Sequence, residues 1–527
     1  MPQDQYQART LPQLVAASAE THAERVAITD GDVTLTYAQL DAARREAGRA
    51  FLAAGLERGD RIAIWAPNMH QWIIAAIGAQ SIGAVLVPLN TRLKGGEAAY
   101  ILRTSSARLL FTVGDFLGVN YPQLLADESL PALEQVVLLS GEAPGTMSWD
   151  GFLAGGHAVP VDKVDEQAAA LTPEDTLDIL FTSGTTGKPK GVVTSHGQNI
   201  RTFETWSATV GLRSDDNYLI INPFFHSFGY KAGWLASIIC GARMIPVKSF
   251  DLDAVLGLVA REKISMIPGP PTIYQSLLAH PRRREYDLSS LRLAVTGAAP
   301  VPVELVRQMR EELGFEVVVT AYGLTETCGV VSICRADDSP ERISHTSGRA
   351  MDGVEMQCVD SAGHVAPAGT PGEIWCRGFN VMQGYLDNPE ETARTITADG
   401  WLRTGDVGVM DADGYVRITD RIKDMFIVGG FNCYPAEIEN TLCSMPGVAR
   451  AAVIGVPDER MGEVARACIV AMPGAALDED VVIAWCRDNM ANYKVPRSVR
   501  FMEEFPMNAG GKVLKTELRR LAEEDPG

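Results

Sequence analysis

The sequence has no long apolar run. In its 527 residues no stretch approaches the roughly 18 apolar residues that a membrane-spanning helix needs. Its beginning, MPQDQYQART, has no basic segment followed by an apolar run, so no secretory signal is predicted. We therefore expect a cytoplasmic protein with no integral membrane segment.

Positive charge is also scarce. The chain has 47 Lys and Arg against 66 Asp and Glu, which gives a formal net charge of −19. Such a chain is repelled at long range by nucleic acid and by anionic membrane surfaces. We expect no nucleic-acid partner, and any polyanionic ligand must be met by locally placed Lys, Arg and backbone N–H groups.

A cysteine framework is missing as well. The nine cysteines are odd in number and show no CxxC spacing, so neither a disulfide scaffold nor a zinc site is predicted, and we expect reduced, mostly buried thiols. Internal repeats and low-complexity tracts are also lacking. Because 46% of the residues are hydrophobic and 21% are charged, the chain is predicted to fold along nearly its whole length.

What the sequence does contain is a series of short apolar runs bounded by Gly, Pro or Asp. These runs predict buried strands at residues 61–67, 84–89, 177–184, 244–247 and 291–297. Helix-like spacing of apolar residues lies between them, for example at 40–54 and 302–313. The alternation predicts an α/β fold with largely parallel sheets.

Beyond residue 350 the pattern changes. The turn sequences DSAGH, ADGW and DADGY predict hairpins or a small barrel-like unit. The segment DRIKD at 420–424 then leads into a further βα pattern. We place a hinge there, which gives a large N-terminal α/β domain over 1–419 and a small C-terminal α+β domain over 425–527.

The strongest local signal is LFTSGTTGKPKGVV, which runs from Leu180 to Val193. Its glycines let backbone N–H groups approach an anion, its hydroxyls can donate to phosphate oxygens, and its lysines supply positive charge. The residues concerned are Thr182, Ser183, Gly184, Thr185, Thr186, Gly187, Lys188, Lys190 and Gly191. The loop does not fit the Walker A pattern GxxxxGK[ST], yet it predicts phosphate binding.

Further motifs follow this loop in order: GAAPVP at 297–302, AYGLTET at 321–327, GWLRTGD at 400–406, DRIKDMFIVGGFNCYPAEIE at 420–439 and NAGGKVLK at 508–515. With them, the chain resembles the acyl- and aryl-CoA synthetases of the adenylate-forming superfamily over nearly its full length. The resemblance implies an AMP-forming acid–thiol ligase. Such an enzyme converts a carboxylate, ATP and CoA to acyl-CoA, AMP and pyrophosphate through an acyl-adenylate, with Mg²⁺ as cofactor.

The resemblance also assigns the nucleotide site. It places Tyr322 along the adenine, Thr325 at the α-phosphate and Glu326 at Mg²⁺, a hard cation that prefers oxygen ligands. Taken alone, a Glu after a strand is usually solvated or caps a helix. The remaining nucleotide-binding residues that it implies are Gly297, Ala298, Ala299, Ala321 and Gly323, which are small enough for an adenine to pack on the backbone.

Four charged residues near or beyond the hinge receive roles in the same way. Asp406 would hold the ribose hydroxyls with help from Arg421, although a turn Asp most often caps its own backbone. Lys512 would offset the charge that grows during adenylation, where an exposed lysine is the ordinary interpretation. Lys423 would be the hinge position about which the mobile C-terminal domain rotates between half-reactions.

The same resemblance implies the remaining roles. Gly429, Gly430 and Phe431 would line the CoA tunnel, and no side-chain base for the CoA thiol is identified. His226 would lie between the acyl and CoA tunnels, with a packing role as the alternative, and it joins Lys512, Glu326 and Thr185 among the expected catalytic residues. The residues expected to contact the acid are His226, Phe228, Gly229, Lys231, Thr296 and Val330.

The acid itself is expected to lack an α-amino group. Peptide-synthetase domains have an Asp in the motif that here reads INPFFHSFGY. The stretches NPFFHSFGYKAG, PGPPTIYQSLLAHP and DLSSLRLAVTGAAPVPVELV are most similar to actinobacterial CoA ligases that activate the bicyclic propanoate left from steroid rings C and D. A fatty or alicyclic acid is the alternative. Lys231 could donate to a ketone of such an acid, or extend to solvent.

Other acceptors remain alternatives for the second half-reaction. An amide synthetase would pass the adenylate to an amine, and a carrier-loading enzyme would pass it to a carrier protein. Homodimers are common among such ligases, so a homodimer is one expected assembly.

Overall fold

The computed structural model describes residues 10–182, 189–297, 301–421, 424–428, 431–458, 460–490, 492–507 and 513–524, without the side chains of residues 420, 421, 431 and 432. The chain divides into two compact units. Residues 1–355 and 376–402 form the first unit, and residues 356–375 and 403–527 form the second. Residues 356–375 and 403–419 thus group with the C-terminal region, while the hinge at 420–424 stays a prediction.

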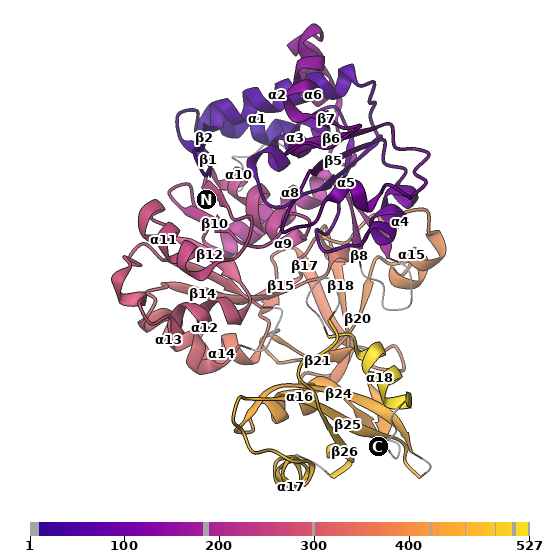
Figure 1. Ribbon diagram of the computed structural model, residues 1–527. Helices are drawn as coiled ribbons and strands as arrows, with labels where there is room; N and C mark the ends of the chain where they lie inside the picture. Colours follow the sequence, from indigo (N-terminus) through magenta and orange to yellow (C-terminus); the bar gives the residue numbers. More distant parts are fainter. Residues whose placement is uncertain are drawn as a thin grey trace. The chain divides into compact units, whose positions relative to one another are not determined.

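One sheet of the first unit contains β8, the strand that leads into the predicted phosphate loop (Figure 1). Its strand order is β19-β9-β8-β4-β3-β5-β6-β7. The strands are β3 (Arg61–Trp65), β4 (Val85–Pro88), β5 (Leu109–Val113), β6 (Gln135–Ser140), β7 (Met147–Ser148), β8 (Thr176–Thr182), β9 (Lys190–Ser195) and β19 (Gly384–Tyr385). Strands β3 to β8 pair in parallel, whereas β9 runs antiparallel to both β8 and β19.

The other sheet of this unit has the order β16-β15-β14-β13-β12-β10-β11-β1-β2. Its strands are β1 (Val26–Asp30), β2 (Val33–Thr36), β10 (Asn217–Ile220), β11 (Arg243–Pro246), β12 (Met266–Gly269), β13 (Leu293–Thr296), β14 (Val317–Tyr322), β15 (Ser332–Ile333) and β16 (Arg349–Ala350). The central strands are parallel, and β2, β15 and β16 add antiparallel edges. The α/β fold with parallel sheets is therefore confirmed, and all five predicted strands are present.

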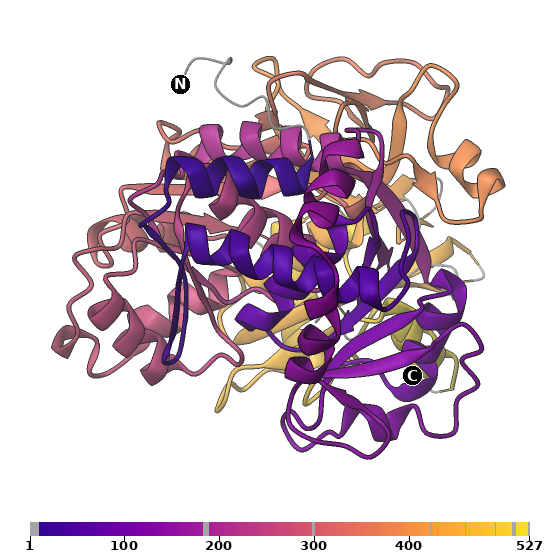
Figure 2. The ribbon, with the colours of Figure 1, turned by 90° about the horizontal axis from the view of Figure 1, so that it is seen from above.

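Helices cover these sheets. The helices of the first unit are α1 (Leu11–Thr21), α2 (Tyr37–Ala53), α3 (His70–Ser81), α4 (Gly95–Ser105), α5 (Tyr121–Leu124), α6 (Trp149–Gly155), α7 (Val161–Ala170), α8 (His196–Val210), α9 (Ser227–Gly229), α10 (Ala236–Cys240), α11 (Leu252–Glu262), α12 (Pro271–Ala279), α13 (Val303–Glu311), α14 (Pro340–His345) and α15 (Pro389–Thr395). Helices α1 and α2 lie side by side (Figure 2). The predicted helices at 40–54 and 302–313 correspond to α2 and α13.

Helix α8, which follows the phosphate-loop hairpin, is fixed by its own ends. The Ser195 hydroxyl accepts a hydrogen bond from the backbone N–H of Gln198, and the Gln198 side chain bonds back to the Ser195 N–H, so two free donors of the first turn are satisfied. At the other end Gly211 adopts φ 76°, a left-handed conformation that glycine tolerates. The helix therefore starts directly at the end of β9.

The second unit contains the two remaining sheets. The first has the order β17-β18-β20-β21, with β17 (Val354–Val359), β18 (Pro371–Gly378), β20 (Leu402–Met410) and β21 (Val416–Arg421). The second contains β22 (Phe426–Val428), β23 (Phe431–Cys433), β24 (Val448–Asp458), β25 (Gly462–Ala471) and β26 (Ser498–Phe501). Antiparallel pairing dominates, and the DADGY turn joins β20 to β21, as a hairpin prediction requires.

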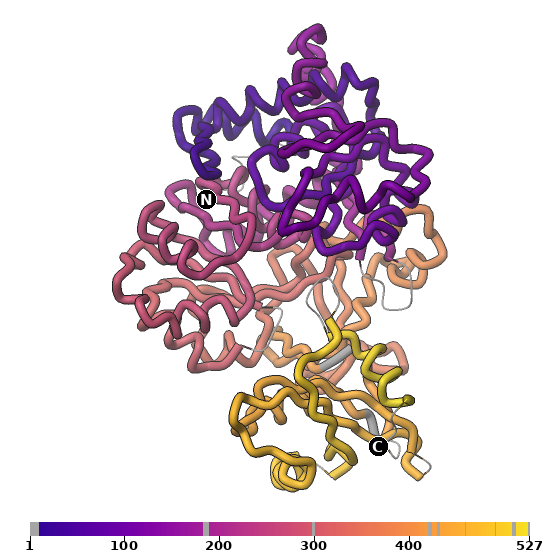
Figure 3. Tube along the Cα trace, viewed as in Figure 1, coloured from indigo at the N-terminus to yellow at the C-terminus, as the bar shows by residue number. Residues whose placement is uncertain are grey.

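The α-helices in the described part of the second unit are α16 (Pro435–Cys443), α17 (Glu479–Asn489) and α18 (Lys515–Glu524). Helix α18 packs on β24, as the yellow end of the tube shows (Figure 3). Two apolar clusters form the core of this part of the second unit, one around Val453 and Ile469 and the other around Ile454 and Leu518.

The cysteine prediction is confirmed, since all nine cysteines are free and only Cys443 is exposed. Within the described ranges, no helix combines the length and apolar character that crossing a membrane requires.

Candidate functional site

The β8–β9 hairpin presents the two ends of the predicted phosphate loop. Thr182 and Lys190 are cross-strand partners, and the Thr182 hydroxyl donates to the Lys190 carbonyl at 3.4 Å. The predicted phosphate ligands Ser183, Gly184, Thr185, Thr186 and Gly187, with Lys188, lie outside the described residues. The structure therefore places the strand ends from which a phosphate loop would project.

The ammonium of Lys190 is held by two side chains of one segment. Its Nζ lies 2.7 Å from Glu391 Oε1 and 4.5 Å from the centre of the Tyr385 ring. The hydrogen bond from Lys190 is the main reason why the pKa of the Glu391 carboxyl is lowered from its ordinary value. Lys190 thus brings positive charge to the loop end, with a carboxylate beside it.

Sequence reasoning missed the segment that supplies Tyr385 and Glu391. It reaches the hairpin because β19 pairs with β9, and the Leu386 N–H donates to the Gly191 carbonyl at 2.8 Å. The available signal was Asn388–Pro389, which predicts the start of a helix, and Asn388 does cap α15. Nothing in the sequence placed that helix beside the phosphate loop.

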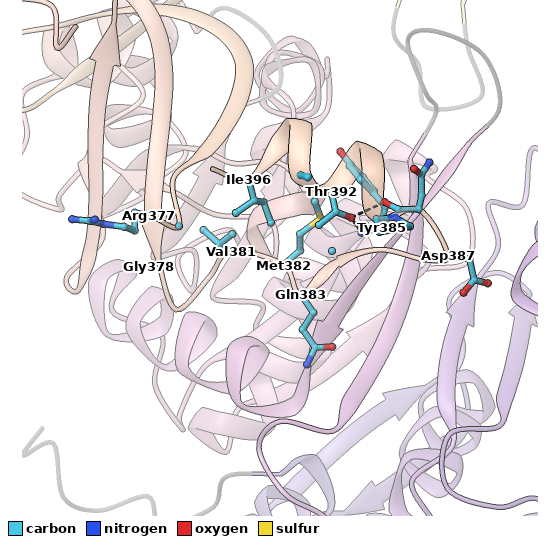
Figure 4. Close-up of a pocket in the computed structure, with 14 residues that line it drawn as sticks. Arg377, Gly378, Val381, Met382, Gln383, Tyr385, Asp387, Thr392 and Ile396 are labelled. Carbon is cyan, nitrogen blue, oxygen red and sulfur yellow. Dashed lines mark hydrogen bonds between the residues drawn. The ribbon is translucent and has the colours of Figure 1, made fainter. Parts of the chain in front are cut away.

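A surface cavity of about 850 Å³ borders the same segment, and the residues labelled at it lie between Arg377 and Ile396 in the sequence (Figure 4). The backbone N–H of Tyr385 donates to the Thr392 hydroxyl at 2.9 Å at this cavity. None of the sequence-predicted site residues is among the described residues that line it. Tyr385 lines the cavity and also contacts both Lys190 and Glu326.

Glu326 is fixed from the same side. The Tyr385 hydroxyl donates to Glu326 Oε1 at 2.9 Å, and the backbone N–H of Met382 donates to the Glu326 carbonyl at 2.9 Å. Burial, followed by the nearby charge of Glu326, raises the pKa of the Tyr385 hydroxyl well above its ordinary value. The Tyr385 hydroxyl therefore stays protonated across the physiological pH range and donates a hydrogen bond to this carboxylate.

The turn that carries Glu326 depends on glycine. A Cβ on Gly323 would lie 2.2 Å from the carbonyl oxygen of Gly329, so a larger residue would break the turn. The turn is closed by the N–H of Val331, which donates to the Tyr322 carbonyl at 2.7 Å. Thr325 and Glu326 lie in its 3-10 helix, η4 (Thr325–Thr327). Tyr322 and Glu326 are thus brought to one edge of the sheet.

The end of β13 meets the end of β14 at this edge. Thr296 is the parallel partner of Thr320, and a Cβ on Gly297 would lie 3.4 Å from the Ala321 carbonyl. A side chain at position 297 would therefore make only an ordinary van der Waals contact with that carbonyl, and the adenine role of this backbone stays a prediction. Ala298 and Ala299 lie outside the described residues. The Thr296 hydroxyl is buried and has no hydrogen-bond partner in the described part of the chain.

His226 is exposed and begins the short helix α9. Its Nδ1 accepts a hydrogen bond from the Phe228 N–H at 3.2 Å, which leaves the ring at the surface and not packed in the core. Gly229 is required next, because a Cβ there would lie 2.2 Å from the Asn222 carbonyl oxygen.

The His226 segment also touches the Glu326 turn, since a Cβ on Gly329 would lie 3.0 Å from Ser227. Val330, another predicted acid contact, is buried in that turn, where its carbonyl accepts from Asn380 Nδ2 at 2.7 Å.

Lys231 requires a correction. We expected it to contact the acid or to extend to solvent, and the second alternative is wrong because the residue is 0% exposed. Its Nζ lies 3.1 Å from both Asp178 Oδ1 and Thr194 Oγ1. The ammonium is therefore already bound within the protein.

In the second unit, Asp406 and Arg421 are cross-strand partners on β20 and β21. Asp406 is 4% exposed, and its N–H donates to the Thr404 hydroxyl at 3.1 Å. The adjacent Gly405 has φ 71°, which favours glycine, and its N–H donates to Glu373 Oε1 at 3.0 Å. The local fold thus presents this carboxylate beside the Arg421 backbone; the Arg421 side chain is not described.

The other predicted residues of the second unit cannot be placed. Lys423, Gly429, Gly430 and Lys512 fall outside the described ranges, and the Phe431 side chain is not described. Met507 and Val513, which flank residues 508–512, form an antiparallel bridge.

Comparison with known proteins identifies the family to which these residues point. Residues 15–386 match the family "AMP-binding enzyme", and residues 437–512 match "AMP-binding enzyme C-terminal domain". A 3-[(3aS,4S,7aS)-7a-methyl-1,5-dioxo-octahydro-1H-inden-4-yl]propanoyl:CoA ligase of Rhodococcus jostii (strain RHA1) is 50% identical over 97% of this chain and 99% of its own length. The ligase of the same name from Mycobacterium tuberculosis is 49% identical over 97% of this chain and 99% of its own length.

A solved structure agrees with these matches. The anthranilate CoA ligase AuaEII, in complex with anthranoyl-AMP, superposes with a TM-score of 0.84 at 29% identity. The alignment covers 97% of each chain. The fold is therefore one in which a carboxylate is known to be held as its adenylate.

Proposed function

Because this chain belongs to the AMP-binding enzyme family and is an AMP-forming acyl-CoA synthetase, we propose that it activates a bicyclic, ketone-bearing propanoate of the kind that steroid rings C and D leave behind. The observation that carries the site assignment is Tyr385. Its side chain contacts both Glu326 and Lys190. The turn that carries Glu326, which follows the predicted adenine contact Tyr322, therefore meets the phosphate-loop hairpin at Tyr385.

In the first half-reaction, the acid carboxylate attacks the α-phosphorus of ATP, and pyrophosphate leaves with the electrons of the broken P–O bond. We assign Tyr322, with Gly297 and Ala321, to the adenine and Thr325 to the α-phosphate. Lys190 and the loop that β8 and β9 support would hold the β- and γ-phosphates. These contacts would hold the α-phosphorus in place for attack by the carboxylate, which is the main contribution that positioning residues make.

Glu326 suits a magnesium ion. Mg²⁺ typically takes one or two carboxylates and completes its shell with waters and substrate phosphates. Tyr385 donates to one Glu326 oxygen, and the other oxygen of this carboxylate would bind the cation. The described residues contain no cluster of three or more His, Cys, Asp or Glu side chains arranged to hold a metal, and the magnesium assignment rests on Glu326. When bound, the ion would neutralise charge on the phosphates.

In the second half-reaction, the CoA sulfur attacks the acyl carbonyl of the adenylate, and AMP departs. We assign Asp406 and Arg421 to the ribose, Lys512 to the adenylation step and Gly429, Gly430 and Phe431 to the CoA arm. Lys423 would be the hinge about which the C-terminal domain rotates between the two half-reactions. No side chain is assigned as the base for the CoA thiol.

The substrate assignment rests on the full-length similarity to two ligases whose names specify a methyl-dioxo-octahydroindenyl propanoate. The residues proposed to surround this acid are His226, Phe228, Gly229, Thr296 and Val330. The buried Thr296 hydroxyl, which has no protein partner in the described part of the chain, could donate to an oxygen of the acid. The two ketones of the bicycle distinguish this acid from a fatty acid.

The decisive experiment measures AMP and pyrophosphate release with Mg-ATP, CoA and a set of matched acids. The set contains the bicyclic diketo propanoate, the same bicycle without ketones, a medium-chain fatty acid and an aryl acid. We expect kcat/KM to be at least about 100-fold higher for the diketo acid than for the ketone-free bicycle, because polar recognition penalises an analogue that lacks the polar group.

Two outcomes would contradict the proposal. Equal turnover of fatty and bicyclic acids would remove the substrate assignment. Acid-dependent pyrophosphate release that continues at the same rate with an amine in place of CoA, with formation of the amide, would favour an amide synthetase.

A further inference from the structure

The first unit contains a fully buried ion pair that the chemistry above does not use. Lys231 Nζ lies 3.1 Å from Asp178 Oδ1, and the side chains of Lys231 and Asp178 are 1% and 0% exposed. Burying two charges costs free energy that their attraction only partly offsets, and apolar side chains of similar size often stabilise a fold as well or better. A role other than stability is therefore worth seeking.

The pair lies within the hairpin that carries the phosphate loop. Asp178 on β8 is the cross-strand partner of Thr194 on β9, and the Thr194 hydroxyl donates to Asp178 Oδ1 at 2.6 Å. Lys231 Nζ lies 3.1 Å from the same hydroxyl oxygen. The ammonium thus bridges both strands, whose other ends are Thr182 and Lys190.

Lys231 comes from the segment that begins at His226. It lies in η2 (Tyr230–Leu235), a π-helix, which is a rare element that occurs frequently at functional sites. The residue before it, Tyr230, is itself fixed, because Gln80 Nε2 donates to its hydroxyl at 3.0 Å. The lysine therefore joins a constrained segment to the base of the hairpin.

A third segment lies near the ion pair. Cys328, in the turn that carries Glu326, is 0% exposed, and burial raises the pKa of its thiol to about 11. The charges of Lys231 and Asp178 are the next contributors to that pKa, so both lie near the thiol. The ion pair thus joins the hairpin to the His226 segment, and that segment contacts the Glu326 turn, where a Cβ on Gly329 would lie 3.0 Å from Ser227.

We propose that Lys231 and Asp178 are positioning residues, which hold the phosphate-loop hairpin in register with the segments that carry His226 and Glu326. This inference rests on the proposed roles of those segments in ATP binding and adenylation. It differs from a direct contact between Lys231 and a ketone of the acid, because the ammonium is already bound by Asp178 and Thr194.

The test is the neutral double variant Lys231→Met with Asp178→Asn, which avoids leaving one buried charge unpaired. We expect it to fold, and we expect KM for ATP to rise or kcat for acid-dependent ATP–pyrophosphate exchange to fall by at least about 10-fold, since a small misplacement of reacting groups is costly. KM for the acid should change by less than about twofold.

A second buried ion pair of the same unit supplies the matched control. Arg292 Nε lies 3.1 Å from Asp216 Oδ1, at the amino end of β13 and so at the opposite end of the strand from Gly297. Arg292→Met with Asp216→Asn should change the melting temperature without changing KM for ATP. If both double variants alter the exchange reaction equally, the Lys231 pair has only a structural role and the inference is wrong.

Two further measurements keep the outcome definite. Thr194→Val retains both charges and removes the bridging hydroxyl, so if the double variant does not fold, this variant should still raise KM for ATP by about threefold or more. Unchanged ATP parameters would overturn the inference, and so would a change confined to KM for the acid. Calorimetric binding of Mg-ATP, expected to weaken in the variants, tests the pair even if the proposed acid proves wrong.

Discussion

The hydroxyl of Tyr385 donates a 2.9 Å hydrogen bond to Oε1 of Glu326, although the two residues are 59 positions apart in the chain. Tyr385 reaches this point because β19 is the edge strand beside β9, and Glu326 reaches it because its turn follows the end of β14. The contact fixes a carboxylate assigned to magnesium and joins it to the Lys190 end of the phosphate-loop hairpin.

Replacing Tyr385 by Phe should therefore weaken the binding of Mg²⁺ at Glu326. A hydrogen bond to a charged group contributes about 1.5–3 kcal/mol, so we expect the Mg²⁺ concentration for half-maximal ATP–pyrophosphate exchange to rise roughly 10-fold or more. Tyr121→Phe is the matched control, because its hydroxyl donates to the Thr91 carbonyl elsewhere in the unit. An unchanged Mg²⁺ dependence in Y385F would show that the hydrogen bond does not orient Glu326 for the cation.

Glu204 on α8 predicts a specific pH dependence of stability. Burial raises the pKa of its carboxyl to about 7, and the positive charge of Arg201 offsets this only in part. The folded protein keeps this proton to a higher pH than the unfolded chain does. The stability contribution is therefore complete below the ordinary carboxyl pKa and is lost as the pH rises towards 7.

Glu204→Gln cannot ionise and should escape that loss. At about pH 8 the variant should melt a few degrees above the parent, and at about pH 4 the two melting temperatures should coincide. Glu311→Gln, at an exposed position of α13, is the control and should show no such pH dependence. A constant difference between E204Q and the parent at both pH values would contradict the assignment.

Asp406→Asn tests the ribose assignment with a side chain of the same size. Loss of a charge-assisted hydrogen bond to a hydroxyl should raise KM for ATP roughly 10-fold or more, while KM for the acid stays near that of the parent. Asp411→Asn, at the turn of the same hairpin, where Oδ1 accepts from the Tyr415 N–H at 2.9 Å, should leave KM for ATP unchanged. Equal effects of the two changes would mean that Asp406 acts only on the hairpin.

Lys512→Ala separates the half-reactions. Removing one preorganised donor should slow adenylate formation by roughly 10²–10³. Conversion of a supplied acyl-adenylate to the thioester should stay largely intact, as rapid-quench measurements can establish. Lys515→Ala is the control, because that lysine pairs with Glu439 at 2.7 Å. If K512A slows both half-reactions equally, the proposed exchange of catalytic faces is wrong.

Much of the fold followed from local patterns. Buried parallel strands need continuous apolar residues, which is why segments such as 61–67 and 84–89 predicted β3 and β4. Glycine spacing at Gly323 and Gly329 likewise reflects a turn in which a Cβ at Gly323 would overlap the backbone. The hairpins beyond residue 350 were predicted from their turn residues, whose side chains form the expected local hydrogen bonds, as Asp411 does.

Side-chain partners from distant segments could not be predicted in this way. Glu391 meets Lys190 across 201 positions, and nothing in NPEET specifies that contact. The lone Asp178 within the apolar run LDILF was a usable signal, since an acidic residue in a buried strand needs a partner. Its partner, however, could be identified only once η2 was placed against β8.

By itself, then, the sequence determined the order of strands and helices, the chemical character of the phosphate loop and the family to which the chain belongs. These properties depend on residue types at short spacing, which the chain fixes locally. Only the tertiary structure decided that Tyr385 donates to Glu326, that Lys190 is paired and that Lys231 is buried. Contacts of that kind depend on which strand edges pair, and strand pairing is set by the packing of the whole sheet.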